Sequence, residues 1–157
     1  MENQLSILAE SLEKKIQVLT AIQEYNKRQE QVFTSEHVDM NSFDEAVEEK
    51  GKLIQQLSRL DDGFEVMYAA LAEQLQKDRV KFAKEICALQ QQIAVIMEMS
   101  VTIQAQEKRN KQLVEQYFSK ERRGISQSRK TLKAAYDYYK KMNNVSIVEP
   151  QFYDSKK

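Results

Sequence analysis

The chain has 157 residues, a length that suits one domain, and 31% of them are charged, with three glycines, one proline and no tryptophan. This composition is typical of long helices or a coiled coil, and the 41% of hydrophobic residues argues against a disordered chain. The formal net charge is zero, but residues 1–106 carry −7 and residues 107–143 carry +7, so the two parts of the chain suit partners of different charge.

The first predicted element is a helix over residues 2–33. Apolar residues recur there at spacings of three and four, from Leu5 to Ile22 and on to Phe33, which places them on one face of a helix. The helix should end at the stretch TSEHVDMNS, because Ser, Asp and Asn side chains compete for backbone hydrogen bonds.

The second predicted element is a helix over residues 43–76. Asn41 or Ser42 can cap it, and Ser42 is followed three residues later by Glu45, which is the spacing of a capping box. Asp61, Asp62 and Gly63 form a weak point, but the apolar spacing continues through them without a change of phase. We therefore predict one uninterrupted helix.

The third predicted element is a long helix over residues 80–142. No glycine or proline separates it from the second, but a single helix over 43–142 would be about 150 Å long. We therefore place a tight turn near residues 76–79, with Asp78 as a cap. Gly124 weakens the third helix, and the serines after it can start a new one, so a hinge is expected there.

These elements predict an all-α fold, an antiparallel three-helix, coiled-coil-like bundle that forms a single domain over residues 1–143. The third helix should extend well beyond the other two, because it would be roughly 95 Å long against about 50 Å for each of them. Its second half would then keep apolar residues without a partner in the chain, which usually marks an interaction site. Residues 144–157 contain Pro150 and should form a short extended or disordered tail.

The tyrosines at 136, 138 and 139 have two interpretations. Tyrosines often pack on neighbouring helices, but no predicted helix is long enough to receive these, and Tyr is a favoured interface anchor. Contact with a partner is the favoured interpretation.

Side chains that commonly act in catalysis or bind metals, such as His and Cys, are scarce in this chain. We therefore expect that the protein is not an enzyme and binds no cofactor or metal. The only histidine, His37, lies in a polar loop with Glu36 and Asp39, and carboxylates without a second His or a Cys are weak ligands. The only cysteine, Cys87, lies in an apolar run, which predicts a buried, inert thiol in a reducing compartment.

The sequence also favours a cytoplasmic protein that neither inserts into a membrane nor binds nucleic acid. The stretch MENQLSILAESLEKK lacks the basic region of a signal peptide, and we expect no stretch to approach the 18–20 apolar residues of a membrane span. The basic residues of 107–143 are spread around the helix among four acids. A solvated face is favoured, then an acidic protein partner, and nucleic acid or a membrane surface last.

Three stretches of the chain resemble FlgN-type flagellar export chaperones. NSFDEAVEEKGKLIQQLSRLDDGFE resembles the second-helix pattern of that family, and LQQQIAVIMEMSVTIQAQEKRNKQLVEQYF resembles its long third helix. The end of the chain, with Phe152-Tyr153-Asp154-Ser155-Lys156, has the form of the family's short tail. Relatives often carry a glycine just after the tyrosine near the end, and this chain has none at Tyr136 or Tyr139.

The resemblance implies a small cytoplasmic helical chaperone. Such a chaperone would bind the C-terminal helical region of hook-associated (hook–filament junction) proteins, prevent premature assembly and deliver them to the flagellar type III export gate. Export-gate contact would fall on Tyr136, Tyr139, Phe152 and Tyr153. Cargo contact would fall on Leu113, Val114, Tyr117, Phe118, Ile125, Leu132 and Tyr136.

The main alternative is a structural homodimeric coiled-coil scaffold or adaptor, in which the third helix pairs with its copy. The two hypotheses differ in the oligomeric state that they predict for the protein without a partner, because a scaffold would be a permanent dimer.

Overall fold

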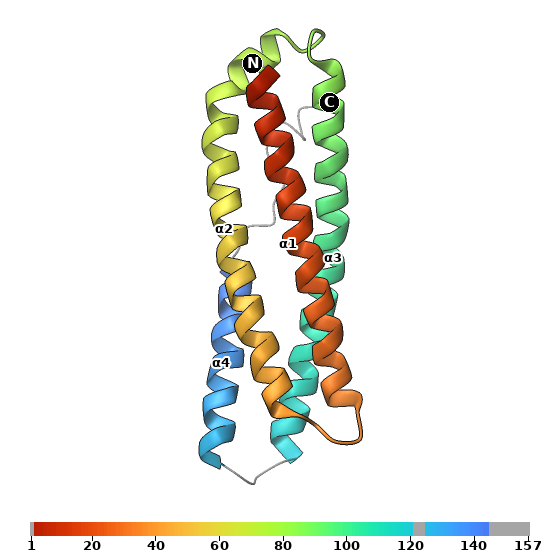
Figure 1. Cartoon of the computed structure of the whole chain (residues 1–157), viewed down its shortest axis with the longest axis vertical. Coiled ribbons are helices and arrows are strands. Elements are labelled where there is room, and N and C mark those ends of the chain that lie inside the picture. Colours follow the sequence, from red (N-terminus) through yellow and green to blue (C-terminus); the bar gives the residue numbers. More distant parts are fainter. Residues whose placement is uncertain (1, 121–124, 145–157) are drawn as a thin grey trace.

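The computed structural model describes residues 2–120 and 125–144, and this part of the chain is entirely helical apart from its two short connections (Figure 1). The all-α class is therefore confirmed. The four helices are α1 (Glu2–Thr34), α2 (Met40–Lys77), α3 (Ala83–Lys120) and α4 (Ile125–Asn144).

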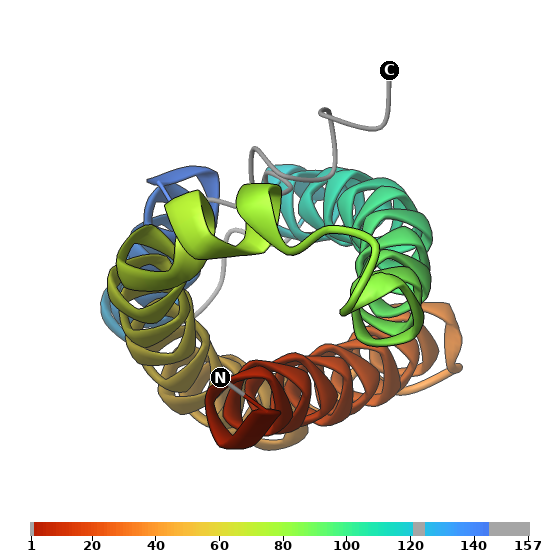
Figure 2. The ribbon, with the colours of Figure 1, turned by 90° about the horizontal axis from the view of Figure 1, so that it is seen from above.

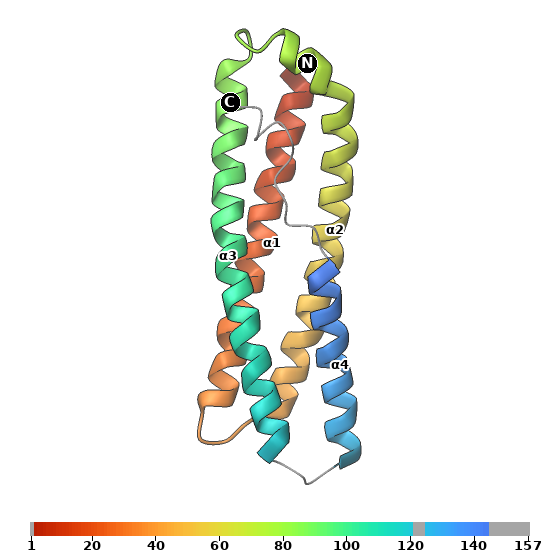
Figure 3. The ribbon, with the colours of Figure 1, turned by 180° about the vertical axis from the view of Figure 1, so that it is seen from behind.

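α1 lies between α2 and α3 in the bundle. It packs along both α2 and α3, which lie on either side of it and hardly touch each other although they are consecutive in the chain. Seen from above, α1, α2 and α3 occupy three corners of the bundle (Figure 2). α4 runs beside α2 and α3 in the half that contains the α1–α2 loop, here called the lower half (Figure 3).

The first two helices end close to where the sequence predicts, but the start of α2 is capped by a different residue. Asp39 is the N-cap, and its carboxylate accepts hydrogen bonds from the backbone N–H groups of Asn41 at 3.0 Å and Ser42 at 3.4 Å. The Ser42 hydroxyl also donates to Asp39 at 2.8 Å. The predicted cap at Asn41 or Ser42 is wrong, because Asp39 can satisfy both free N–H groups of the first turn.

α2 continues through Gly63 as predicted, and the chain turns just after it. Asp78 is the C-cap of α2, where its backbone N–H donates to the carbonyl oxygen of Gln74 at 2.9 Å. It therefore ends α2 instead of starting α3, and α3 begins at Ala83 after a short run of turns.

The predicted third helix over 80–142 is wrong. α3 ends at Lys120, and the next helix runs back in the opposite direction from Ile125 (Figure 1). This return buries Ala135, Tyr138 and Tyr139 in the core, which a straight helix extending past its partners could not do. The bundle therefore has a fourth helix where the prediction had an overhang without a partner. The predicted hinge, Gly124, lies outside the described residues.

Candidate functional site

A buried polar cluster joins all four helices at one level of the bundle. At its centre is Lys50 of α2, whose side chain is fully buried. Its ammonium donates to Asn26 Oδ1 and Gln29 Oε1, both at 2.6 Å, and to the two carboxylate oxygens of Glu107 at 3.0 and 3.1 Å. The Tyr138 hydroxyl of α4 donates to Glu107 Oε1 at 2.5 Å, so one carboxylate connects α2, α3 and α4.

Burial sets the protonation of this cluster. Removal from water lowers the pKa of Lys50 to about 8, although the nearby negative charge of Glu107 acts in the opposite direction. Burial raises the pKa of Tyr138, and the adjacent Glu107 carboxylate raises it further. The Lys50 ammonium also lies 4.1 Å from the centroid of the Tyr138 ring, a distance that favours a cation–π interaction.

The cluster is a buried site in which the Lys50 ammonium has no hydrogen left for a substrate, although Gln29 Nε2 and the neighbouring Tyr139 hydroxyl have no hydrogen-bond partner in the part of the chain that the structure describes. The three N–H bonds of the Lys50 ammonium are directed to Asn26, Gln29 and Glu107, which is the full donor capacity of a lysine. Among the described residues, no group of three or more His, Cys, Asp or Glu side chains could hold a metal ion. We interpret the cluster as the element that fixes the register of the four helices.

None of the residues of this cluster was predicted from the sequence to be a polar core group, although the sequence carries a signal for it. Lys50 lies three residues after Val47 and four before Ile54, at a core position of the apolar stripe. Polar residues occupy equivalent core positions in α1 and α3. They are Asn26 and Gln29 in α1, and Glu107 and Asn110 in α3.

The contact between Tyr138 and Glu107 shows how far α4 reaches along the bundle. Six residues follow Tyr138 in α4, so its last residue lies level with about position 101 of α3 and about position 56 of α2. Beyond that level no described helix covers the side between α2 and α3 (Figure 3). We call this side, bordered by residues 56–77 of α2 and 83–101 of α3, the open side.

The α3 border of the open side is largely apolar. Its residues lie on the flank opposite Gln92, whose amide donates to the carbonyl oxygen of Ala9 in α1 at 3.1 Å. Val101 is 66% exposed, and Ile86 and Met97 are half-buried. At spacings of three and four the row reads Ile86, Gln90, Ala94, Met97 and Val101.

The α2 border of the open side is small and acidic. Its residues lie opposite Leu60 and Met67, which line a pocket of about 230 Å³ between α1 and α2. Asp62 and Glu65 are exposed there, and negative charge from both contributes to raising the pKa of Asp61, after burial. The row reads Ser58, Asp62, Glu65, Ala69, Ala72 and Gln76.

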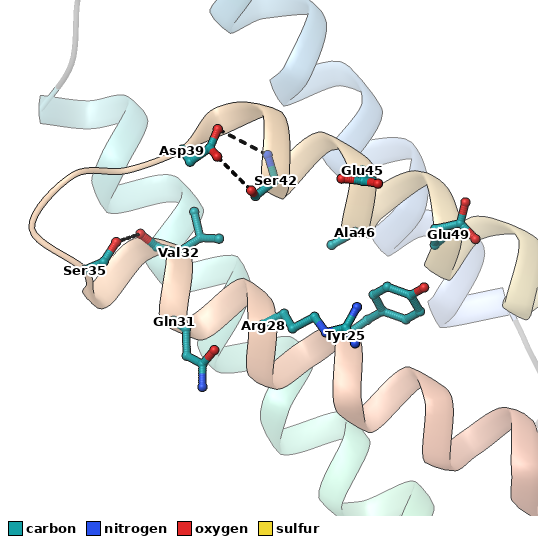
Figure 4. A pocket seen from close by; sticks show the side chains of 10 residues that line it. All are labelled: Tyr25, Arg28, Gln31, Val32, Ser35, Asp39, Ser42, Glu45, Ala46 and Glu49. Carbon is teal, nitrogen blue, oxygen red and sulfur yellow. Dashed lines mark hydrogen bonds between the residues drawn. The ribbon is translucent and has the colours of Figure 1, made fainter.

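A larger hollow of about 530 Å³ lies between the end of α1 and the start of α2 (Figure 4). Most of the residues that line it are polar, and several of their side chains are already engaged. The Arg28 guanidinium lies 5.0 Å from the centroid of the Tyr25 ring, and the Asp39 carboxylate caps α2. The hollow is an alternative site, but its polar groups do not converge on one point (Figure 4).

The predicted partner residues fall into three groups. Val114 is in the core, and Leu113, Tyr117 and Phe118 are half-buried, with the Tyr117 ring 5.6 Å from that of Phe33. Tyr139 is buried, whereas Tyr136 is 47% exposed. For the remaining predicted residues the structure describes no side chain. These are Ile125 and Leu132, which belong to α4, and Phe152 and Tyr153.

Two expectations about α3 are wrong. Cys87 is exposed, because it points away from the core positions at Leu89 and Ile93. α3 is also long and apolar enough to cross a membrane by length and composition, the one such helix in the described part of the chain. Core helices of soluble proteins pass the same test, and α3 packs along α1.

Comparisons of this chain with family models, curated proteins and solved structures give no match.

Proposed function

We propose that this chain is a cytoplasmic FlgN-type export chaperone. It binds the C-terminal helical region of hook-associated proteins, keeps them from assembling prematurely and delivers them to the flagellar export gate. The proposal is supported by the resemblance in the sequence and by the arrangement of the described helices, which leave one side of the bundle uncovered.

The observation that carries the proposal is the short length of α4. α2 and α3 each have 38 residues, whereas α4 has 20. The part of α3 beyond its reach is about 28 Å long. An amphipathic cargo helix of about 18 residues has the same length. Such a helix could complete the fourth corner of the bundle, which is the helix-in-groove mode of peptide recognition.

The two borders of the open side indicate what the cargo helix should look like. The row with Met97 and Val101 favours an apolar stripe on the cargo. Ala69 and Ala72 leave room for close approach by a helix. Asp62 and Glu65 favour a basic residue beside that stripe. An amphipathic helix with Lys or Arg at one edge therefore fits best.

Tyr136 is the predicted cargo residue that a partner reaches most readily, because its side chain is exposed on α4. The contacts predicted for the half-buried Leu113, Tyr117 and Phe118 belong to the lower half of the bundle. These contacts remain part of the proposal.

The proposal is tested by calorimetric titration of the chain with hook-associated proteins, both full length and lacking the C-terminal helical segment. Full-length cargo should bind, and removal of the segment should abolish binding. Equal binding of both forms of cargo contradicts the proposed grip.

A matched pair of variants tests the position of the site. Val101→Asp places a charge beside the open side, whereas Val95→Asp makes the same change on the α1 flank of the same helix, where Val95 is 44% exposed. Val101→Asp should weaken cargo binding about tenfold or more, because a charge within a desolvated apolar contact costs more than 1.4 kcal/mol. Equal effects of the two variants contradict this position.

The alternative, a homodimeric scaffold, is favoured by the outer face of α3. Glu98 is the only charged residue between positions 86 and 106, although Val95 and Val101 are both substantially exposed. Such a face could pair with its copy. Sedimentation separates the two functions, because a dimer that persists on dilution supports the scaffold.

A further inference from the structure

The residues that follow α4 suit the open side in length. The chain has thirteen residues after Asn144, VSIVEPQFYDSKK, which can span about 43 Å when extended. The last residue of α4, Asn144, lies at about the level of Val101, where the open side begins, and the α3 border is about 28 Å long. The segment 145–157 can therefore reach every part of the open side.

The apolar residues of this segment also match the open side in spacing. Five positions separate Ile147 from Phe152, which is about 16 Å of extended chain. Eleven positions separate Met97 from Ile86 on α3, which is also about 16 Å of helix. Pro150 favours an extended conformation between the two apolar groups.

We propose that the segment 145–157 docks along the open side, with Ile147 near Met97 and Phe152 near Ile86, and that it competes there with any other occupant. The surface would then be covered by the chain itself until a stronger ligand displaces the segment. The docking is independent of the proposed function, but its consequence, an autoinhibited cargo site, rests on that function.

Disulfide trapping in the full-length chain tests the docking directly. In a Cys87→Ser background, the pair Met97→Cys and Ile147→Cys should form an intramolecular disulfide under mild oxidation of dilute protein. A second pair, Val101→Cys and Val145→Cys, guards against a folding defect, because Val101 is 66% exposed and tolerates substitution. Mobility on a non-reducing gel and intact mass report the bond.

The matched control places one cysteine on the outer surface of α2. Val66 is 74% exposed and lies on the side of α2 that points away from the core. The pair Val66→Cys and Ile147→Cys should give at least fivefold less intramolecular disulfide than the pair with Met97→Cys. Equal yields from the two pairs, or no bond in either open-side pair, overturn the docking.

Deletion of residues 145–157 tests the competition separately. The shortened chain should bind cargo about tenfold more tightly, because a site that its own chain covers is available only part of the time. Unchanged cargo affinity overturns the competition and leaves the proposed function standing. Failure of both chains to bind cargo contradicts the proposed function, and the disulfide yields still decide the docking.

Discussion

Lys50 and Glu107 form a buried ion pair between α2 and α3, two helices that otherwise hardly touch, across a sequence separation of 57 residues. The long lysine side chain crosses the core and thereby connects helices that the backbone keeps apart. Asn26 and Gln29 of α1 complete its shell, so the pair is desolvated but fully hydrogen-bonded on the lysine side.

Removal of the cation alone should be strongly destabilising. Lys50→Met leaves the Glu107 carboxylate buried without its positive partner, which should lower the free energy of unfolding by about 3–5 kcal/mol. The double variant Lys50→Met/Glu107→Leu should be less destabilised than the sum of the single variants, by about 2 kcal/mol. Urea unfolding followed by circular dichroism measures both values.

Lys52→Met is the control for this experiment. Lys52 pairs with Glu49 at 3.1 Å on the surface of the same helix, and its loss should leave the unfolding midpoint unchanged within error. Additive effects of the two core substitutions would show that Lys50 and Glu107 are not coupled.

The stability of the protein should rise with pH between about 8 and 10. Folded Lys50 loses its proton above its pKa of about 8, whereas the unfolded chain keeps it up to the ordinary value of 10.5. The unfolded state then binds more protons, so the free energy of unfolding increases with pH, by about 2 kcal/mol over this interval. Urea unfolding at a series of pH values measures the rise.

Above pH 10 the trend should reverse. Burial raises the pKa of both Tyr138 and Tyr139 in the folded state, so the unfolded chain releases these protons first and folding loses stability. Lys50→Met should remove the rise below pH 10 and keep the fall above it. A rise of equal size in that variant contradicts the assignment to Lys50.

The hydroxyl of Tyr138 should matter and that of Tyr136 should not. Tyr138→Phe removes a hydrogen bond to the buried Glu107 carboxylate, which should cost about 1.5–3 kcal/mol. Tyr136→Phe makes the same change at an exposed position of the same helix and should stay within about 0.5 kcal/mol. Hydrogen exchange of α4 and urea unfolding report the two effects, and similar losses for both variants contradict the role of the cluster in holding α4.

The glycines inside α2 should be replaceable with a gain. A Cβ atom added at Gly51 or Gly63 meets nothing within 4 Å, so alanine brings its higher helix propensity without a clash. Each substitution should raise the free energy of unfolding by about 1 kcal/mol, or the midpoint of thermal unfolding by about 2–4 °C. A fall in the midpoint for Gly51→Ala would show that α4 packs more tightly there than the structure indicates.

The sequence predicted the parts of the fold that local patterns determine. The apolar spacing of three and four located the first two helices, and the uninterrupted phase through Gly63 correctly predicted that α2 continues. The end of α3 at Lys120 was not predicted, because the apolar spacing runs on past it and the weak point expected at Gly124 was interpreted as a hinge inside one long helix. Tertiary contacts of α4 with α2 and α3 decide it.

The candidate sites were harder to predict for the same reason. Cys87 lies beside apolar residues in sequence but faces away from the core, a difference that depends on which flank of α3 meets α1. The Lys50 cluster combines residues from four helices, and no local pattern shows that Asn26, Glu107 and Tyr138 come together. The open side follows only from the actual length of α4.

The arrangement of α1 between α2 and α3 has a consequence for how the chain folds. Hydrogen bonds between α1 and α3 join residues up to 84 positions apart, as in the bond from Asn110 to the carbonyl oxygen of Asn26. Helical bundles built from consecutive hairpins fold quickly because their contacts are local. Here α3 must return past α2 to reach α1, so a larger loop-closure entropy precedes the stabilising contacts. We expect folding to be slower than in an up-and-down bundle of the same size.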